Sequence, residues 1–175
     1  LTLTSGTPIL TSDVTGATTL YFTPFRGNRV TLYDGSANWG RYVLTEKSLD
    51  ISGYDADSNY DIFLYDNSGT LTLSGTKWTD ATTRATALAW QDGVLVKSGA
   101  TNYLYLGTIR INSSGGECDM IFDGGSDNAT VAFCGAWNYY NRISRMFTVK
   151  DDTNTTYTTG TWRIYDGDSN NECKF

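Results

Sequence analysis

The sequence predicts an all-β fold, an antiparallel β-sandwich or jelly-roll-like domain with at most one short helix. Thr, Ser, Gly, Asn and Asp dominate the chain together with Val, Ile, Tyr and Phe, which favour strands. Apolar and polar residues alternate with a period of two in many places, and no helical period persists over the length of a helix. Asp-Gly pairs separate the alternating stretches and are typical of tight turns.

The chain of 175 residues fits one domain, which we assign to residues 1–175. Its 14% aromatic and 18% charged content indicates a folded chain rather than a disordered one. No linker-like change of composition divides it. Because the sequence begins at Leu1 without an initiator Met, we expect a processed chain or part of a longer protein.

Pro24, in "YFTPFRGNRV", predicts a strand break or an edge strand near the start of the chain. The clearest hairpin follows in "NYDIFLYDNSGTLTLSGTKW", residues 59–78, where two alternating stretches flank the turn sequence "DNSG". The next segment, Asp80–Gly93, opens with a residue that can cap a helix and closes with Gly. Its Thr content and the "VLVKS" that follows fit another strand equally well.

An aliphatic-Tyr-Asp motif occurs three times, as "LYDG" at Leu32, "LYDN" at Leu64 and "IYDG" at Ile164. It is either a repeated ligand-binding loop or a strand end followed by a turn. Asp and Asn bond their own backbone, and Gly supplies a positive φ without steric cost. We therefore interpret the motif as turn chemistry.

The three cysteines are Cys118, Cys134 and Cys173. Cys118 and Cys134 bracket a segment that reads as strand, Gly-rich turn and strand, so their sulfurs can face each other across a hairpin. A disulfide and two buried free thiols are equally consistent with this spacing. Three thiols with this spacing and no His do not make a zinc site.

The composition excludes several classes of function. A formal net charge of −6 has the wrong sign for binding a phosphate backbone, so we expect no nucleic-acid partner. No run of about 18 apolar residues occurs, so no membrane insertion is predicted. The chain has no His, the commonest general base and a frequent metal ligand. We predict no enzyme and no cofactor, with a glycan depolymerase built on paired carboxylates as the remote alternative.

Asp55–Asp61 begins like a calcium loop, with Asp, Asp and Asn at alternate positions. The sixth position is Tyr60, whereas the tight turn of a calcium loop needs Gly. We therefore expect a solvated acidic turn and no metal site.

The richest aromatic and cationic segment is "GAWNYYNRISRMF", residues 135–147. Trp, Tyr and Arg carry much of the energy of protein interfaces because they bury large areas and keep a polar tip. One interpretation is a core strand with Trp137 and Tyr139 inward and Tyr140 outward, whose two arginines pair with the surplus acids. The other is a subunit interface. The interface candidates are Trp137, Tyr139, Tyr140, Arg142 and Arg145.

Three blocks in this order carry a family resemblance: "LTLTSGTP…TSDVTGATTLYFTPFRGNRVTLYDGSANW", "WTDATTRATALAWQDGVLVKSGATNYLYLGTIR" and "WNYYNRISR". Together they resemble a β-rich family of tailed-bacteriophage and prophage proteins associated with virion surfaces, such as capsid decorations, head fibres and tail fibres. The resemblance covers nearly the whole chain. It implies location on the virion surface, assembly as a homotrimer, and contact with other virion proteins.

Two hypotheses follow from this resemblance and the residues together. In the first, the chain is a virion structural protein, a trimeric decoration or fibre module that acts by packing. In the second, it is a carbohydrate-binding or host-receptor-binding domain at a tail-fibre tip, with a host surface glycan as its partner.

Overall fold

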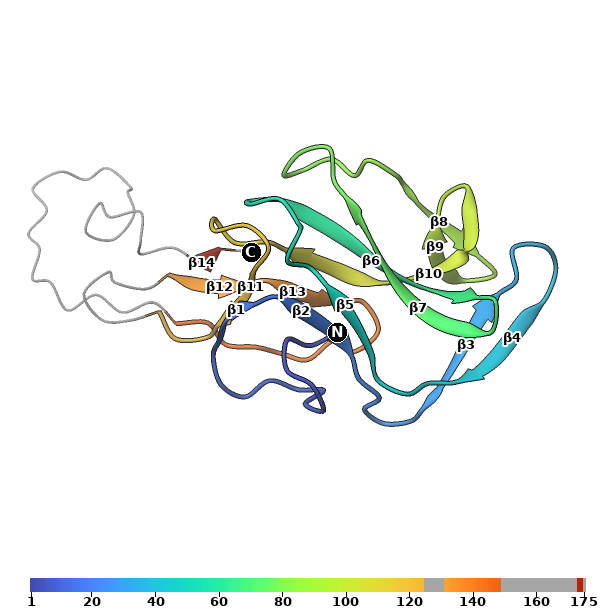
Figure 1. The fold of residues 1–175 in the computed structure, drawn as a ribbon, viewed down its shortest axis with the longest axis horizontal. Coiled ribbons are helices and arrows are strands. Elements are labelled where there is room, and N and C mark those ends of the chain that lie inside the picture. The colour runs from blue at the N-terminus through green and yellow to red at the C-terminus, as the bar shows by residue number, and fades with distance from the viewer. Residues whose placement is uncertain (125–130, 149–172, 175) are drawn as a thin grey trace, which may run out of the picture.

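The computed structural model describes residues 1–124 and 131–148, together with the backbone of residues 173–174. This part of the chain is all β and contains no helix, which confirms the predicted fold class. Every strand pair is antiparallel except β12 with β14. Figure 1 shows two groups of strands, with β6 to β10 at the upper right and β1, β2, β11 and β12 at the lower left.

The strands of the first half of the chain are β1 (Val14–Ala17), β2 (Thr19–Phe22), β3 (Arg29–Tyr33), β4 (Trp39–Val43), β5 (Lys47–Asp50), β6 (Asn59–Asn67) and β7 (Thr70–Lys77). Those of the second half are β8 (Leu88–Gln91), β9 (Val94–Lys97), β10 (Ala100–Arg110), β11 (Cys118–Ile121), β12 (Ala132–Cys134), β13 (Ala136–Asn138) and β14 (Cys173–Lys174). Pro24 lies between β2 and β3, so the predicted strand break is confirmed.

The largest sheet has six strands in the order β7-β6-β10-β9-β8, with β13 also paired to β10. One edge of β10 pairs with β6, while the other pairs with β9 near Ala100 and with β13 near Gly107. The pairing with β6 shifts register between Tyr105 and Gly107, as at a β-bulge. The shift places Tyr105 and Thr108 on the same face, where their hydroxyls lie 2.7 Å apart.

The other strands form a four-stranded sheet, β1-β11-β12-β14, and two pairs, β2-β5 and β3-β4. The hydrophobic core lies between them and the inner face of the six-stranded sheet, which contributes Ile62, Leu64, Leu73 and Leu104. Leu20 of β2 packs in the same core and is fully buried. This arrangement is the sandwich-like packing of two layers.

The aliphatic-Tyr-Asp motifs are turns at the two sites that the structure describes. Asp34 directly follows β3. Its carboxylate accepts hydrogen bonds from the backbone of Ser36, Ala37 and Asn38 at 2.7, 2.9 and 3.1 Å. These bonds hold the pKa of Asp34 well below its usual range. Asp66 likewise accepts a bond from Gly69 N at 2.7 Å. The third copy, at residues 164–171, lies outside the described residues.

The segment Asp80–Gly93 forms no helix. Its last part is strand β8, which pairs with β9 through a two-residue turn, where Asp92 and Gly93 have φ values of 49° and 82°. Residues 80–87 form the loop that precedes β8. The strand alternative is therefore correct for Leu88–Gln91 alone, whereas the Thr-rich part of the segment is loop.

Candidate interaction surface

Strand β13 places the aromatic segment, residues 135–147, at the edge of β10. Gly107 of β10 faces Asn138, and Thr108 faces Trp137. A Cβ at Gly107 would lie 1.9 Å from the carbonyl oxygen of Trp137, so only Gly allows the two backbones to approach this closely. The conformation of β10 therefore determines where the aromatic segment begins.

The two cysteines beside β13 are free buried thiols, so the disulfide left open by the sequence is not formed. Cys134 lies opposite Met120 in the β11–β12 pair, which makes Cys118 its diagonal neighbour. Diagonal neighbours lie about 7 to 8 Å apart, too far for a disulfide without backbone movement. The Cys118 thiol instead donates to Gly135 O at 3.2 Å. The tip of this hairpin, residues 125–130, lies outside the described residues.

The chain after β13 is held against the sandwich by its aromatic and cationic side chains. Tyr139 donates its backbone N–H to Leu106 O at 2.9 Å, and its ring lies 5.7 Å from that of Tyr105. The guanidinium of Arg142 lies 4.8 Å from the centre of the Tyr139 ring and donates to Tyr139 O at 3.0 Å. Arg142 thus stiffens this turn of the chain through cation–π and hydrogen-bond contacts.

Arg145 bridges the aromatic segment to the N-terminal segment, residues 1–10. It donates to Leu10 O and lies 5.1 Å from the centre of the Phe122 ring. Neither Arg142 nor Arg145 forms an ion pair with an acid in the described residues. The interpretation in which these arginines neutralise the surplus acids is therefore wrong for the described part of the chain.

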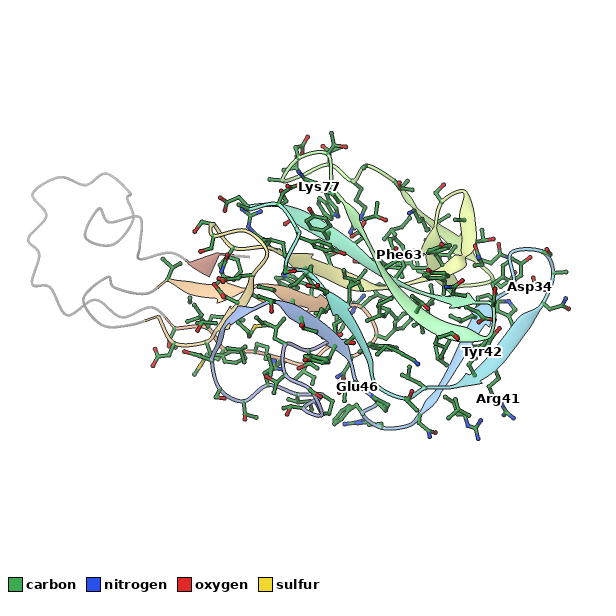
Figure 2. All side chains as sticks on the ribbon, in the orientation of Figure 1. Asp34, Arg41, Tyr42, Glu46, Phe63 and Lys77 are labelled. Atoms are coloured by element: carbon green, nitrogen blue, oxygen red, sulfur yellow. The ribbon has the colours of Figure 1, made fainter. Side chains whose placement is uncertain are left out.

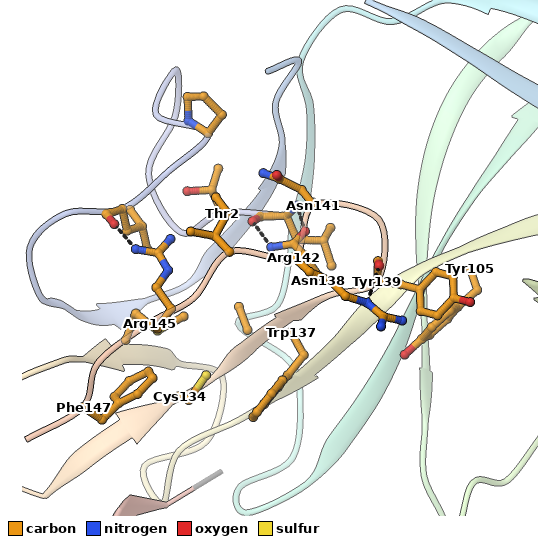
Figure 3. Close-up of a pocket in the computed structure, with 16 residues that line it drawn as sticks. Thr2, Tyr105, Cys134, Trp137, Asn138, Tyr139, Asn141, Arg142, Arg145 and Phe147 are labelled. Carbon is orange, nitrogen blue, oxygen red and sulfur yellow. Dashed lines mark hydrogen bonds between the residues drawn. The ribbon is translucent and has the colours of Figure 1, made fainter. Parts of the chain in front are cut away.

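A groove with a volume of about 560 Å³ lies between the aromatic segment and the N-terminal segment, as Figure 3 shows. Four of the five predicted interface residues line it: Trp137, Tyr139, Arg142 and Arg145. A second groove, of about 360 Å³, includes the fifth, Tyr140, together with Phe25 and Val94. Leu1, Pro8 and Asn138 line both grooves. The structure therefore brings all five predicted residues to neighbouring grooves.

Side chains from elsewhere in the chain fix the N-terminal segment between these grooves. The Asn138 side chain accepts a bond from Leu1 N and donates to Leu1 O at 2.8 Å. The carboxylate of Glu46 accepts bonds from Ser5 Oγ at 2.6 Å, Thr23 Oγ1 at 2.6 Å and Gly6 N at 2.7 Å. Figure 2 shows Glu46 at the lower edge of the molecule, near the middle of its long axis. Hydrogen bonds from Ser5, Thr23 and Gly6 lower the pKa of Glu46.

Exposed apolar side chains concentrate in the aromatic segment. Among the described residues, seven large hydrophobic side chains are exposed, and four of them are Trp137, Tyr140, Ile143 and Met146. Met146 is 78% exposed and Trp137 is 48% exposed. Trp137 was expected to point inward if this segment were a core strand, and that expectation is wrong. Clusters of exposed apolar groups are typical of surfaces that bind another molecule.

The acidic residues at Asp55–Asp61 do not converge on one point. Asp55 pairs with Lys77 at 2.8 Å, and Asp57 pairs with Arg110 at 3.5 Å. Asp61 is only 2% exposed and pairs with Arg84 at 2.8 Å, so the expected solvated turn is wrong for this residue. Each carboxylate meets a different cation, an arrangement that serves structure rather than metal binding.

Sequence reasoning missed the polar network around Asp61. Asp61 accepts bonds from Arg84 Nε at 2.8 Å and from Thr108 Oγ1 at 2.7 Å, and Arg84 lies 4.4 Å from the centre of the Trp78 ring. The only local signal is an Asp at an alternating position of an otherwise apolar strand. Its partners are 23 and 47 residues away in sequence, so no spacing rule identifies them.

Comparison with protein families, curated proteins and solved structures found no match to this chain. Within the described residues, no helix is long and apolar enough to cross a membrane. The aromatic segment and its two grooves are therefore the features that bear on function.

Proposed function

We propose that this chain is a structural module of a bacteriophage virion surface, a decoration or fibre domain that assembles as a homotrimer and acts by packing. The single observation that carries the assembly is the clustering of exposed Trp137, Tyr140, Ile143 and Met146 on one segment beside two grooves. Trp, Tyr, Met and Arg are the residue types that protein interfaces favour. The family resemblance supports the virion setting and the trimer.

The packing around the segment supports an interface rather than a flexible tail. Arg145 ties the segment to Leu10, the Tyr139 N–H ties it to Leu106, and Arg142 stiffens the turn from within, so its backbone is held before any partner arrives. A preorganised surface pays less conformational entropy on association than a mobile one. Burial of such an apolar surface stabilises the assembly in proportion to the area covered, by about 25 cal/mol per Å².

The test replaces two exposed apolar residues of the segment by charges, in the double variant Ile143→Asp, Met146→Asp. We expect the unmodified chain to sediment as a trimer and the double variant as a monomer, because two buried unpaired charges per subunit oppose association. The matched control is Val43→Asp, an apolar residue on β4 whose exposure lies between those of Ile143 and Met146, which should leave the assembly intact.

Circular dichroism establishes that the variants remain folded. A monomeric unmodified chain at high concentration contradicts the proposed assembly. A double variant that stays assembled contradicts the placement of the interface.

A further inference from the structure

The outer face of the six-stranded sheet is a second surface, distinct from the aromatic segment in composition. We define it as the face away from the core, which carries Asp61, Phe63 and Tyr65 of β6. Asp61 and Phe63 are themselves buried beneath neighbouring side chains, whereas Tyr65 is half-buried. The residues of β6 alternate between the two faces, and Ile62 and Leu64 belong to the core. Tyr103 stacks on Tyr65 with ring centres 4.4 Å apart, so it lies on the outer face too.

Lys97 is the central cation of this face. Its ammonium donates to Thr76 Oγ1 at 2.9 Å and lies 5.4 Å from the centre of the Phe63 ring and 5.6 Å from that of Tyr103. Lys97 has no carboxylate partner among the described residues. Asp61, the acid of this face, is already paired with Arg84. The face therefore presents one uncompensated positive charge on a chain whose net charge is −6.

Aromatic rings and hydroxyl groups surround this charge. Trp90 is 66% exposed and lies two residues from Leu88, the residue opposite Lys97, so it shares the face of Lys97. Thr72 and Ser74 of β7 face Tyr65 and Phe63 and are half-buried. The surface thus combines a flat indole ring with phenol and alcohol hydroxyls.

We propose that the outer face binds an oligosaccharide that carries a carboxylate, with a sugar ring stacked on Trp90 and the carboxylate on Lys97. Sugar rings offer C–H groups to an aromatic face and hydroxyls to Thr, Ser and Tyr hydroxyls. A carboxylate complements the single uncompensated cation, and a charge-assisted hydrogen bond is stronger than a neutral one. This inference does not depend on the proposed assembly.

The centre of this face differs from the core of a protein interface, even though protein interfaces also favour aromatic residues such as Trp90. Lys and Ser are depleted in protein interfaces, whereas the outer face centres on Lys97 beside Ser74. Nucleic acid is also disfavoured, because a single half-buried cation on an acidic chain cannot release many phosphate counterions. A short acidic glycan needs only one such cation.

The experiment screens the unmodified chain on an array that displays uronate- and sialate-containing oligosaccharides beside their neutral counterparts. We expect binding to acidic members, weakened by added salt because the Lys97 contact is partly exposed. For the best acidic oligosaccharide, calorimetric titration should show a loss in affinity of about tenfold or more in Trp90→Ala, equivalent to about 1.4 kcal/mol. Lys97→Met should bind the acidic oligosaccharide no better than its neutral counterpart.

The matched control is Phe25→Ala, another exposed aromatic residue, which lines the second groove and should not change glycan affinity. The variant Met146→Asp separates the two proposals, because it should lower assembly without removing glycan binding to a single subunit. Failure to bind any acidic glycan overturns the inference, as does full affinity in Trp90→Ala. Equal binding of neutral and acidic forms overturns the role of Lys97.

Discussion

Asp61 is the buried carboxylate of the described part of the chain. It lies on β6, receives Arg84 from the loop before β8 and Thr108 from β10, and so joins three parts of the chain. A buried charge is tolerated only when it is paired and hydrogen-bonded. The Asp61–Arg84 pair therefore holds the loop at residues 78–87 against the sheet. It adds little to the net free energy of unfolding, because the desolvation of Asp61 offsets the attraction between the charges.

Removal of this carboxylate should be costly. We expect Asp61→Ala to lower the free energy of unfolding by about 1 to 3 kcal/mol, since the variant leaves a cavity lined by Thr108, which loses its acceptor, and by the partly exposed Arg84, which loses its ion pair. Asp55→Ala is the control: it removes an ion pair whose acid is 65% exposed, so its loss of stability should be much smaller. Urea unfolding followed by tryptophan fluorescence measures both. Equal losses in the two variants contradict the structural role of Asp61.

The thiols of Cys118 and Cys134 should be inert in the folded chain. Burial raises the pKa of Cys134 to about 11, and it raises the pKa of Cys118 further above its ordinary value. At pH 8 both are therefore protonated, and the thiol is not the reactive form. We expect iodoacetamide to label neither peptide in native conditions and both in urea, as measured by mass spectrometry. Rapid native labelling of Cys118 is the contradictory result.

At the scale of elements, the β10–β13 pair positions the interaction surface. Gly107→Ala forces a methyl group against the Trp137 carbonyl, so we expect β13 to detach from β10 while the rest of the sheet persists. Hydrogen exchange should show lost protection at residues 136–139 and a smaller change at β6. Gly27→Ala is the control, because nothing lies near its Cβ position. Unchanged protection of β13 contradicts this dependence.

The Glu46 contacts should make the N-terminal segment sensitive to acid. Hydrogen bonds to the Glu46 carboxylate hold its folded-state pKa below the unfolded value of about 4.3. Their contribution to the stability of the fold is therefore complete above that value, and it is lost as the pH falls through the folded-state pKa. The amide signal of Gly6, which donates to this carboxylate, should report the transition by NMR. In Glu46→Gln the transition should be absent. A Gly6 signal that titrates alike in both proteins contradicts the assignment.

At the scale of the whole molecule, local patterns predicted the strands and turns well. Alternation and Asp-Gly turns identified the hairpin of β6 and β7 and the corners at Asp34 and Asp66, because those features depend on neighbours in sequence. The free state of Cys118 and the pairing of Asp61 with Arg84 depend on register and on distant strands, which sequence spacing does not specify. The aromatic segment was identified by composition, but its outward orientation needed the structure.

In the proposed homotrimer the aromatic segment is buried between subunits, and oxidative footprinting of the unmodified chain measures this burial. Met146 and Trp137 react readily with hydroxyl radicals when exposed, and Trp90 serves as an internal reference because it lies outside the proposed interface. We expect oxidation of Met146 and Trp137 to fall as the protein concentration rises and the trimer forms, while oxidation of Trp90 stays constant. Equal oxidation of Met146 at low and high concentration, in a sample that light scattering shows to be assembled, contradicts the claim that this segment is the interface.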